Sequence, residues 1–347
     1  MLIALALIVS LILLVFIHEL GHFIAAKQAG IRVEEFGFGF PPRMFGIKKG
    51  ETLYSVNWLP LGGFVRIYGE NRERLEIDRA SGGAINEKQS FAHQSLRVRC
   101  TVIAAGISIN IIAGWILLVG VNLIGARQAV VITQIQPESP AAVAGLVAGD
   151  ELQGFKTAEE FVAFTHSHTS QEVAIQVIRD GAPQQITAQL RETAKPGEGV
   201  LGAAVSDVGF EALSFVPAIK KATLDTINAV AEIWRSFGRL IVGLFTTATV
   251  PENIVGPVGI FGIAGSLSNL GIIYIVQLIA MISLNLGALN AIPFPALDGG
   301  RLLFLLIEKI RGAPVHHIKE AWAHGISFVL LIVLMLVITG RDIARLI

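Results

Sequence analysis

The sequence has few charged residues and almost no cysteine. Only 16% of its 347 residues are Asp, Glu, Lys or Arg, and the formal net charge is zero. A nucleic-acid-binding surface needs a basic excess, so that class of partner is excluded. The single cysteine, Cys100, excludes an internal disulfide and a zinc site built from cysteines. With 53% hydrophobic residues and a mean hydropathy of +0.64, the chain has the composition of a membrane protein.

Two long stretches lack charged side chains altogether, namely residues 1–17 and 253–297. A hydrocarbon core about 30 Å thick needs about 20 mostly apolar residues to cross it. Four segments are long enough, roughly residues 2–26, 101–125, 271–297 and 321–340. The first resembles the core of a signal peptide but has no basic residue before it. We therefore expect it to be a retained transmembrane helix.

The charged residues predict how the chain is oriented. Residues 27–99 and the loop 300–320 are basic, whereas residues 127–211 are acidic. The positive-inside rule places the basic segments in the cytoplasm. We expect a multi-pass membrane protein, with residues 127–211 and both termini on the extracytoplasmic side.

The motif HELGH lies at the end of the first uncharged stretch. Residues four apart share a helix face, so His18 and His22 can direct both imidazoles at one metal ion. Glu19, next to them, is the candidate general base. Ionisable groups within an apolar span cost about 2.5–3.5 kcal/mol each on insertion scales and call for a partner. We therefore predict a metal site rather than a helix end that reaches the headgroups.

A catalytic zinc normally takes a third protein ligand. The position that supplies a third histidine in metzincins is occupied by Gln28, which excludes that class, and Glu34 and Glu35 follow a turn that aims them badly. Asp298 ends the second uncharged stretch, and Pro293 and Pro295 interrupt the helix before it. Asp298 is therefore the candidate third ligand, close to the cytoplasmic side of the membrane.

Residues 53–68 predict a membrane-associated β-hairpin, with two short strands around Pro60 and the Gly62-Gly63 pair. An unpaired strand edge at membrane depth must be buried or face a cavity. Such an edge, at Gly62, Gly63, Phe64 and Val65, can bind an extended peptide by strand addition. A hairpin that only plugs the protein is an equal alternative.

Residues 127–195 predict a soluble insert. Residues 130–135, 173–179 and 185–190 alternate as strands do, and residues 158–166 favour a helix. The segment SPAAVAGLVAGD at residues 139–150 resembles that of a bacterial PDZ domain. This resemblance implies an α+β domain that either binds a peptide or periplasmic partner or acts as a size filter. Apolar residues at helical spacing in 215–247 predict an interfacial amphipathic helix, and Gly256-Pro-Val-Gly259 predicts a bend before the third span.

Several motifs occur together: HExxH in the first span, AGISIN at 105–110, LGGFVRIYGE at 61–70, LDG at 297–299 and one PDZ-like insert. This combination resembles the bacterial site-2 protease family, the RseP-type intramembrane zinc metalloproteases of peptidase family M50. The resemblance implies one zinc ion per chain, held by His18, His22 and Asp298, with Glu19 as general base. It implies that Asn290 binds the oxyanion or the substrate backbone; an interhelical hydrogen bond is an equal alternative. For Asn110 we expect packing rather than catalysis.

The expected fold is a polytopic α-helical membrane protein with about four transmembrane helices, the β-hairpin and an inserted α+β PDZ-like domain. Its parts are residues 1–126, 127–195, 196–255 and 256–347. The expected function is zinc-dependent cleavage of transmembrane segments of single-span proteins, such as anti-sigma factors or signal-peptide remnants. Two alternatives use the same residues: a non-enzymatic PDZ membrane scaffold and a membrane zinc transporter.

Overall fold

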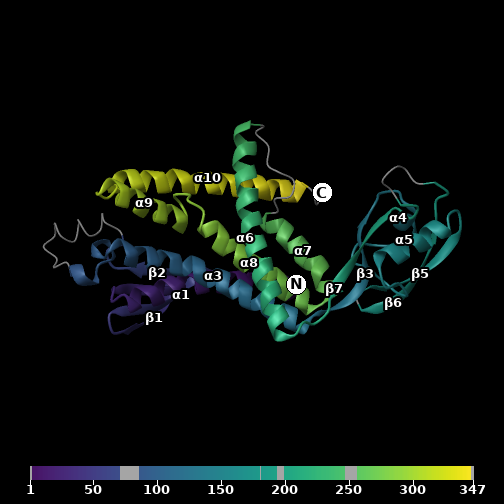
Figure 1. Cartoon of the computed structure of the whole chain (residues 1–347), viewed down its shortest axis with the longest axis horizontal. Helices are drawn as coiled ribbons and strands as arrows, with labels where there is room; N and C mark the ends of the chain where they lie inside the picture. Colours follow the sequence, from purple (N-terminus) through teal and green to yellow (C-terminus); the bar gives the residue numbers. More distant parts are fainter. Residues whose placement is uncertain (1, 71–85, 180, 194–198, 247–255, 345–347) are drawn as a thin grey trace. The chain divides into compact units, whose positions relative to one another are not determined.

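The computed structural model describes residues 2–70, 86–179, 181–193, 199–246 and 256–344, so the two ends of the linker expected at 196–255 lie outside the described residues. The chain forms two compact units, each described here by itself. The first comprises Met1–Leu117, Thr223–Ile260 and Ile279–Ile347, and the second comprises Leu118–Ala222 and Phe261–Leu278. Figure 1 shows the elements in chain order: α1 (Leu2–Gln28), β1 (Val33–Lys49), β2 (Thr52–Ile67), the short η1 (Glu87–Gln89) and η2 (Phe91–His93), α3 (Leu96–Ile124), β3 (Ala126–Ile135), α4 (Pro140–Ala144), β4 (Glu151–Leu152), α5 (Ala158–Ser167), β5 (Glu172–Arg179), β6 (Ala182–Gln189), β7 (Ala203–Phe210), α6 (Phe215–Thr246), α7 (Pro257–Leu270), α8 (Ile272–Asn290), α9 (Asp298–Arg311) and α10 (His317–Ala344).

Among the described residues, four helices are long and apolar enough to cross a membrane: Ala4–Gln28 of α1, Leu96–Ile124 of α3, Ile272–Asn290 of α8 and Ile318–Ala344 of α10. These four candidate spans agree with the prediction of a polytopic membrane protein. The predicted end of the third span at residue 297 is wrong, because α8 stops at Asn290. Pro293 and Pro295 explain the difference, since a proline removes a backbone donor and disfavours helical conformation in the residue before it.

The first β-structure is not the hairpin that the sequence predicts. The residues around Tyr54 and Val65 do not pair with each other; both pair with Phe36 of β1. The first part of β1 therefore lies between the two halves of β2, antiparallel to the half at Gly63–Arg66 and in parallel register with the half at Leu53–Val56. Phe36 is buried at this central position, where pairing on both sides satisfies its backbone groups. The sequence analysis missed this because it considered only residues 53–68.

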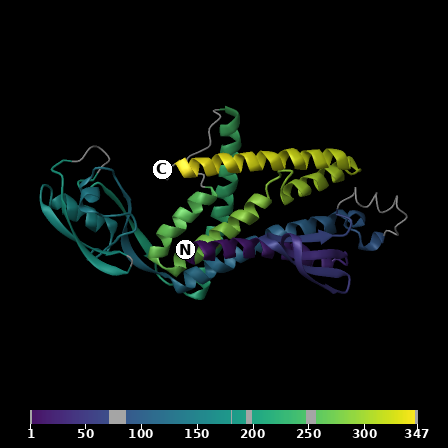
Figure 2. The same ribbon diagram turned by 180° about the vertical axis from the view of Figure 1, so that it is seen from behind.

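The apolar face of this sheet packs on α1, which lies beside it in Figures 1 and 2. The ring of Phe36 lies 5.0 Å from that of Phe16 and 4.8 Å from that of Phe23, between ring centroids. Offset aromatic pairs at these separations add to the free energy gained by burying their surface. The contact fixes the sheet next to the turn of α1 that carries the HExxH motif.

The second unit contains a five-stranded antiparallel sheet with strand order β6-β5-β4-β3-β7. Its core is formed by alternate residues of the strands together with Phe161 of α5, which is 2% exposed. The strands and the helix expected between residues 130 and 190 are present. The sheet also includes β7, which pairs with β3 and lies beyond the boundary expected at residue 195.

Two further helices follow this sheet. The amphipathic helix expected at 215–247 is present as α6, and it is not among the candidate spans. Its residues 223–246 run crosswise to α10 in both ribbon views. The expected bend at 256–259 is wrong: Pro257 begins α7, and the chain changes direction at Gly271, whose φ is +118°. Proline is well suited to the first position of a helix, and glycine to a positive φ after its end.

Candidate metal centre

The HExxH motif lies entirely within α1 and presents both histidines on one face. His18 and His22 are 8% and 7% exposed, and their Nε2 atoms lie 3.2 Å apart. The helix alone produces this pairing, because residues four apart are neighbours on its surface.

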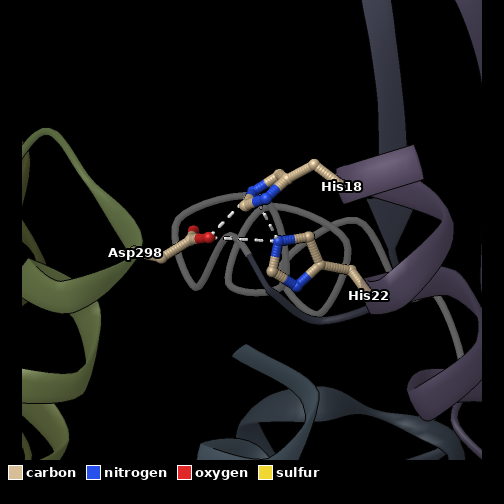
Figure 3. A group of neighbouring side chains, drawn as sticks. All are labelled: His18, His22 and Asp298. Atoms are coloured by element: carbon tan, nitrogen blue, oxygen red, sulfur yellow. Dashed lines mark hydrogen bonds and ion pairs between the residues drawn. The ribbon is translucent and has the colours of Figure 1, made fainter. Parts of the chain in front are cut away.

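Asp298, the first residue of α9, comes from a distant part of the chain (Figure 3). Its Oδ2 atom lies 3.0 Å from Nε2 of His18 and 3.2 Å from Nε2 of His22. These three residues are the one group of three or more possible metal-ligating side chains found in the described part of the chain. The sequence-predicted residues are therefore brought together at one point.

The arrangement fits a metal ion better than it fits hydrogen bonds. Oδ2 of Asp298 is buried and has no hydrogen-bond partner, although two ring nitrogens lie within 3.2 Å of it. These nitrogens are close but are not aligned to donate to it. Ligands around a tetrahedral zinc, at about 2.0–2.2 Å from the metal, lie about 3.3 Å from one another. The observed separations of 3.0–3.2 Å are close to that value.

The aspartate is held in its charged form. Burial raises the pKa of the Asp298 carboxyl, but the neighbouring imidazoles of His18 and His22 lower it more, so the pKa lies below the ordinary aspartate value. A metal ligand must be deprotonated, and Asp298 meets this requirement at neutral pH.

Both histidines have a partner on α3 at their other ring nitrogen. Nδ1 of His22 lies 2.9 Å from the carbonyl oxygen of Val102, so its N–H donates there and Nε2 carries the free lone pair. Nδ1 of His18 lies 3.5 Å from the side-chain amide of Asn110, whose Oδ1 is buried without a partner. A half-turn of this amide would let Oδ1 accept the Nδ1 proton of His18, which leaves Nε2 of His18 free as well.

The helices α1 and α3 touch at glycines. A Cβ atom on Gly21 would lie 2.6 Å from the carbonyl oxygen of Ala105, and one on Gly106 would lie 2.3 Å from Nε2 of His22. No real Cβ contact is this short. The absence of side chains at these positions therefore lets α3 approach closely enough to hold the imidazoles.

A cavity of about 250 Å³ opens beside the three residues. Glu19 lines it together with His22 and Asp298, so the candidate base and the metal ligands face the same space. Phe64 and Val65 of β2 line it too, whereas Gly62 and Gly63 pack against Val15 and Phe16 of α1. Asn290 is the last residue of α8 and is partly buried.

Three ionisable residues in the same cavity were missed by the sequence analysis: Glu70, Arg301 and His324. Arg301 forms an ion pair with Glu70. The spacing of Arg301 from Asp298 was the available signal, because residues three apart share a helix face. Asn110, for which packing is expected, lies next to the imidazole of His18.

Comparison with known proteins agrees with this geometry. The model of "Peptidase family M50" matches residues 6–334. The zinc metalloprotease RasP of Geobacillus kaustophilus is 31% identical, over 96% of this chain and 95% of its own length. The regulator of sigma-W protease RasP of Bacillus subtilis is 29% identical, over 96% of both chains. A putative zinc metalloprotease of Clostridium acetobutylicum is 28% identical, over 95% of this chain and 94% of its own.

The family match covers nearly the whole chain, and these relatives match along almost their entire length. We therefore assign the protease activity and the zinc cofactor to this chain as well. The chain belongs to peptidase family M50 and is a membrane zinc metalloprotease.

Proposed function

We propose that His18, His22 and Asp298 hold the zinc ion and that Glu19 is the general base of an intramembrane endopeptidase. The observation that supports this assignment is the meeting of three ligand atoms, all within 4.8 Å of one another, beside a cavity that Glu19 also lines. Bound zinc activates water and polarises the scissile carbonyl as a Lewis acid.

The chain's own residues then move the proton. Glu19 takes a proton from the attacking water and passes it to the leaving amine, as a carboxylate within reach of both can do. Asn110 and the Val102 carbonyl keep the two imidazoles oriented while this happens. Asn290, eight residues before Asp298, binds either the oxyanion or the unwound substrate backbone.

The substrate is the transmembrane segment of a single-span protein. A helical peptide bond is shielded by its own hydrogen bonds, so the segment must unwind before it is cut. The half of β2 at Phe64 and Val65 pairs with β1 on one side, and among the described residues no strand pairs with its other side. This edge offers the unwound segment replacement hydrogen bonds next to the metal centre.

One relative supports a particular class of substrate. Because the Bacillus subtilis protein carries the name regulator of sigma-W protease, we propose membrane-bound anti-sigma factors, and otherwise signal-peptide remnants. We further propose that the protein lies in the bacterial inner membrane, with the five-stranded sheet and both termini outside. The sheet domain then acts as a PDZ-like module that binds a periplasmic peptide or excludes bulky substrates.

The test is the Glu19→Gln variant, reconstituted in liposomes with a single-span substrate. We expect it to bind zinc like the wild type, because the ligands remain, and to lose cleavage by at least about a hundredfold, the usual scale of general-base catalysis. An Asp298→Ala variant should lose both zinc and cleavage. Unchanged cleavage by Glu19→Gln would contradict the protease mechanism, and a defect only in zinc transport would favour the transporter.

A further inference from the structure

Helix α9 carries Asp298, and the segment before it packs closely on Gly299 and Gly300, in the first turn of this helix. Residues 291–297 connect it to α8 through an irregular segment that contains two prolines. The metal centre requires Asp298 to lie within 3.2 Å of two atoms on α1. The preceding segment holds only the first turn of α9, so contacts further along the helix are needed to set its direction and with it the place of this ligand.

One face of α9 makes these contacts. Asp298, Arg301, Leu305 and Glu308 are spaced by three, four and three residues, which places them along a single stripe of the helix. Leu305 in the middle of the stripe is 8% exposed. Leu306 and Ile310 on the other side are 51% and 77% exposed. The stripe is therefore the side by which α9 packs on the rest of the first unit.

Two ion pairs flank Leu305 on this stripe. Arg301, one turn after Asp298, pairs with Glu70, which follows β2. Near the other end, the carboxylate of Glu308 accepts two hydrogen bonds from Arg99 of α3, at 2.5 and 3.1 Å. The side chains of Arg99 and Glu308 are only 6% and 17% exposed. Such a two-bond pairing fixes orientation as well as distance.

Arg301 and Glu308 carry charges opposite to those that stabilise a helix at their positions. A cation near the start of a helix and an anion near its end are both unfavourable with the helix dipole. Arg301 and Glu308 occupy those positions, so intrinsic helix stability does not explain them. Their ion pairs with Glu70 and Arg99, on other elements, explain these charges.

We propose that Arg301 and Glu308 are positioning residues of the metal centre, which dock α9 through Glu70 and Arg99 and so set where Asp298 stands relative to His18 and His22. This inference rests on the proposed function, in which Asp298 is a zinc ligand. It adds that the Arg301–Glu70 ion pair, at the end of β2, holds Asp298 in place. This ion pair lies next to the strand edge that is proposed to bind substrate.

The experiment compares Arg301→Glu, Glu70→Arg and the exchanged double variant Glu70→Arg/Arg301→Glu in the full-length protein. Zinc affinity is measured by competition with a chelator, and cobalt-substituted protein gives an absorption spectrum that reports the geometry around the metal. We expect each single variant to bind zinc at least about tenfold more weakly, the scale of outer-shell changes, and the exchange to restore most of the affinity. Glu308→Gln tests the second pair with a smaller change, and thermal unfolding is recorded for every variant.

The matched control is Glu51→Gln. Glu51 pairs with Lys27 of α1 at 2.8 Å, within the same unit, but this pair does not involve α9. We expect its zinc affinity and cobalt spectrum to be unchanged.

Three results would overturn the inference: single variants with wild-type zinc affinity, an exchanged variant as weak as the single ones, or lower thermal stability with an unaltered cobalt spectrum. Asp298→Ala separates this failure from that of the proposed function. If that variant keeps zinc, the ligand assignment itself is wrong. If it loses zinc while Arg301→Glu retains it, only the positioning role is wrong.

Discussion

At the residue scale, His22 leaves no room for a side chain on the helix beside it. A methyl group on Gly106 would lie 2.3 Å from Nε2, the atom that faces Asp298. We expect Gly106→Ala to displace the imidazole, and overpacking of this kind costs about 1–3 kcal/mol. If this cost falls on the metal-bound form, zinc affinity decreases about five- to a hundredfold, since 1.4 kcal/mol is about tenfold.

Zinc competition measurements test this expectation, and α3 offers a matched control. A Cβ on Gly120 would have no neighbour within 4 Å, so Gly120→Ala should bind zinc as the wild type does. Equal zinc affinity in the two variants would show that α3 can move away from His22 without loss.

The amide of Asn110 should matter to the metal although it does not contact it. Asn110 is fully buried and lies 3.5 Å from the outer nitrogen of His18. Asn110→Leu keeps the number and branching of the side-chain heavy atoms but removes the partner that orients the ring, so we expect about tenfold weaker zinc binding. Asn122→Leu, at another buried position of α3, is the control for losing a buried amide. If both variants weaken zinc binding equally, Asn110 has no specific role.

The sequence marks the proposed metal ligands and general base better than it marks the residues that support them. His18, Glu19 and His22 follow from local spacing, and Asp298 stands out as the charge that ends a long uncharged stretch. Gly106 and Asn110 lie in the AGISIN motif, but the sequence does not show that they contact His22 and His18, because these contacts depend on how α3 packs on α1. Arg301 falls between these cases, because its spacing from Asp298 was visible but its partner Glu70 was not.

At the scale of elements, the metal centre joins α1 to α9, which are far apart in the chain. An ion that binds only the folded protein stabilises it by about 4 kcal/mol when its concentration is a thousand times the dissociation constant. We therefore expect a chelator to lower the temperature of thermal unfolding. Scanning calorimetry in detergent micelles, with and without added zinc, measures the change.

Two variants make this expectation specific to the proposed ligands. Asp298→Ala should unfold at the same temperature with and without zinc, because the bridge between the helices is lost. Glu19→Gln should keep the full zinc-dependent increase, because it retains all three ligands. An increase that persists in Asp298→Ala would mean that zinc binds elsewhere.

Elements were predictable where a single segment determines them. The long apolar helices and the amphipathic α6 were found because their patterns are local. The pairing of β2 was wrong because its partner, the first part of β1, lies outside the segment considered. The expected end of the third span at residue 297 is wrong because the apolar stretch continues past the end of α8, whereas Pro293 and Pro295 prevent the helix from continuing.

At the scale of the whole molecule, charge determines the expected orientation. Residues 27–99 are basic and residues 127–211 acidic, and lysine and arginine are retained on the cytoplasmic side of spanning helices. Four spans, the number of candidate helices among the described residues, would place both termini on one side of the membrane. The proposed substrate class depends on this orientation: we expect a metal centre near the cytoplasmic face to cut a segment whose extracytoplasmic part has already been removed.

Thiol labelling in sealed membrane vesicles tests the orientation. In a Cys100→Ser background, Lys48→Cys and Gln184→Cys each introduce one exposed thiol, in β1 and β6. A membrane-impermeant reagent should label position 184 in right-side-out vesicles and position 48 in inverted ones, and detergent should expose both. The reverse pattern would place the acidic sheet domain in the cytoplasm. That result would leave the metal centre intact but would exclude extracytoplasmic trimming as the step that prepares its substrate.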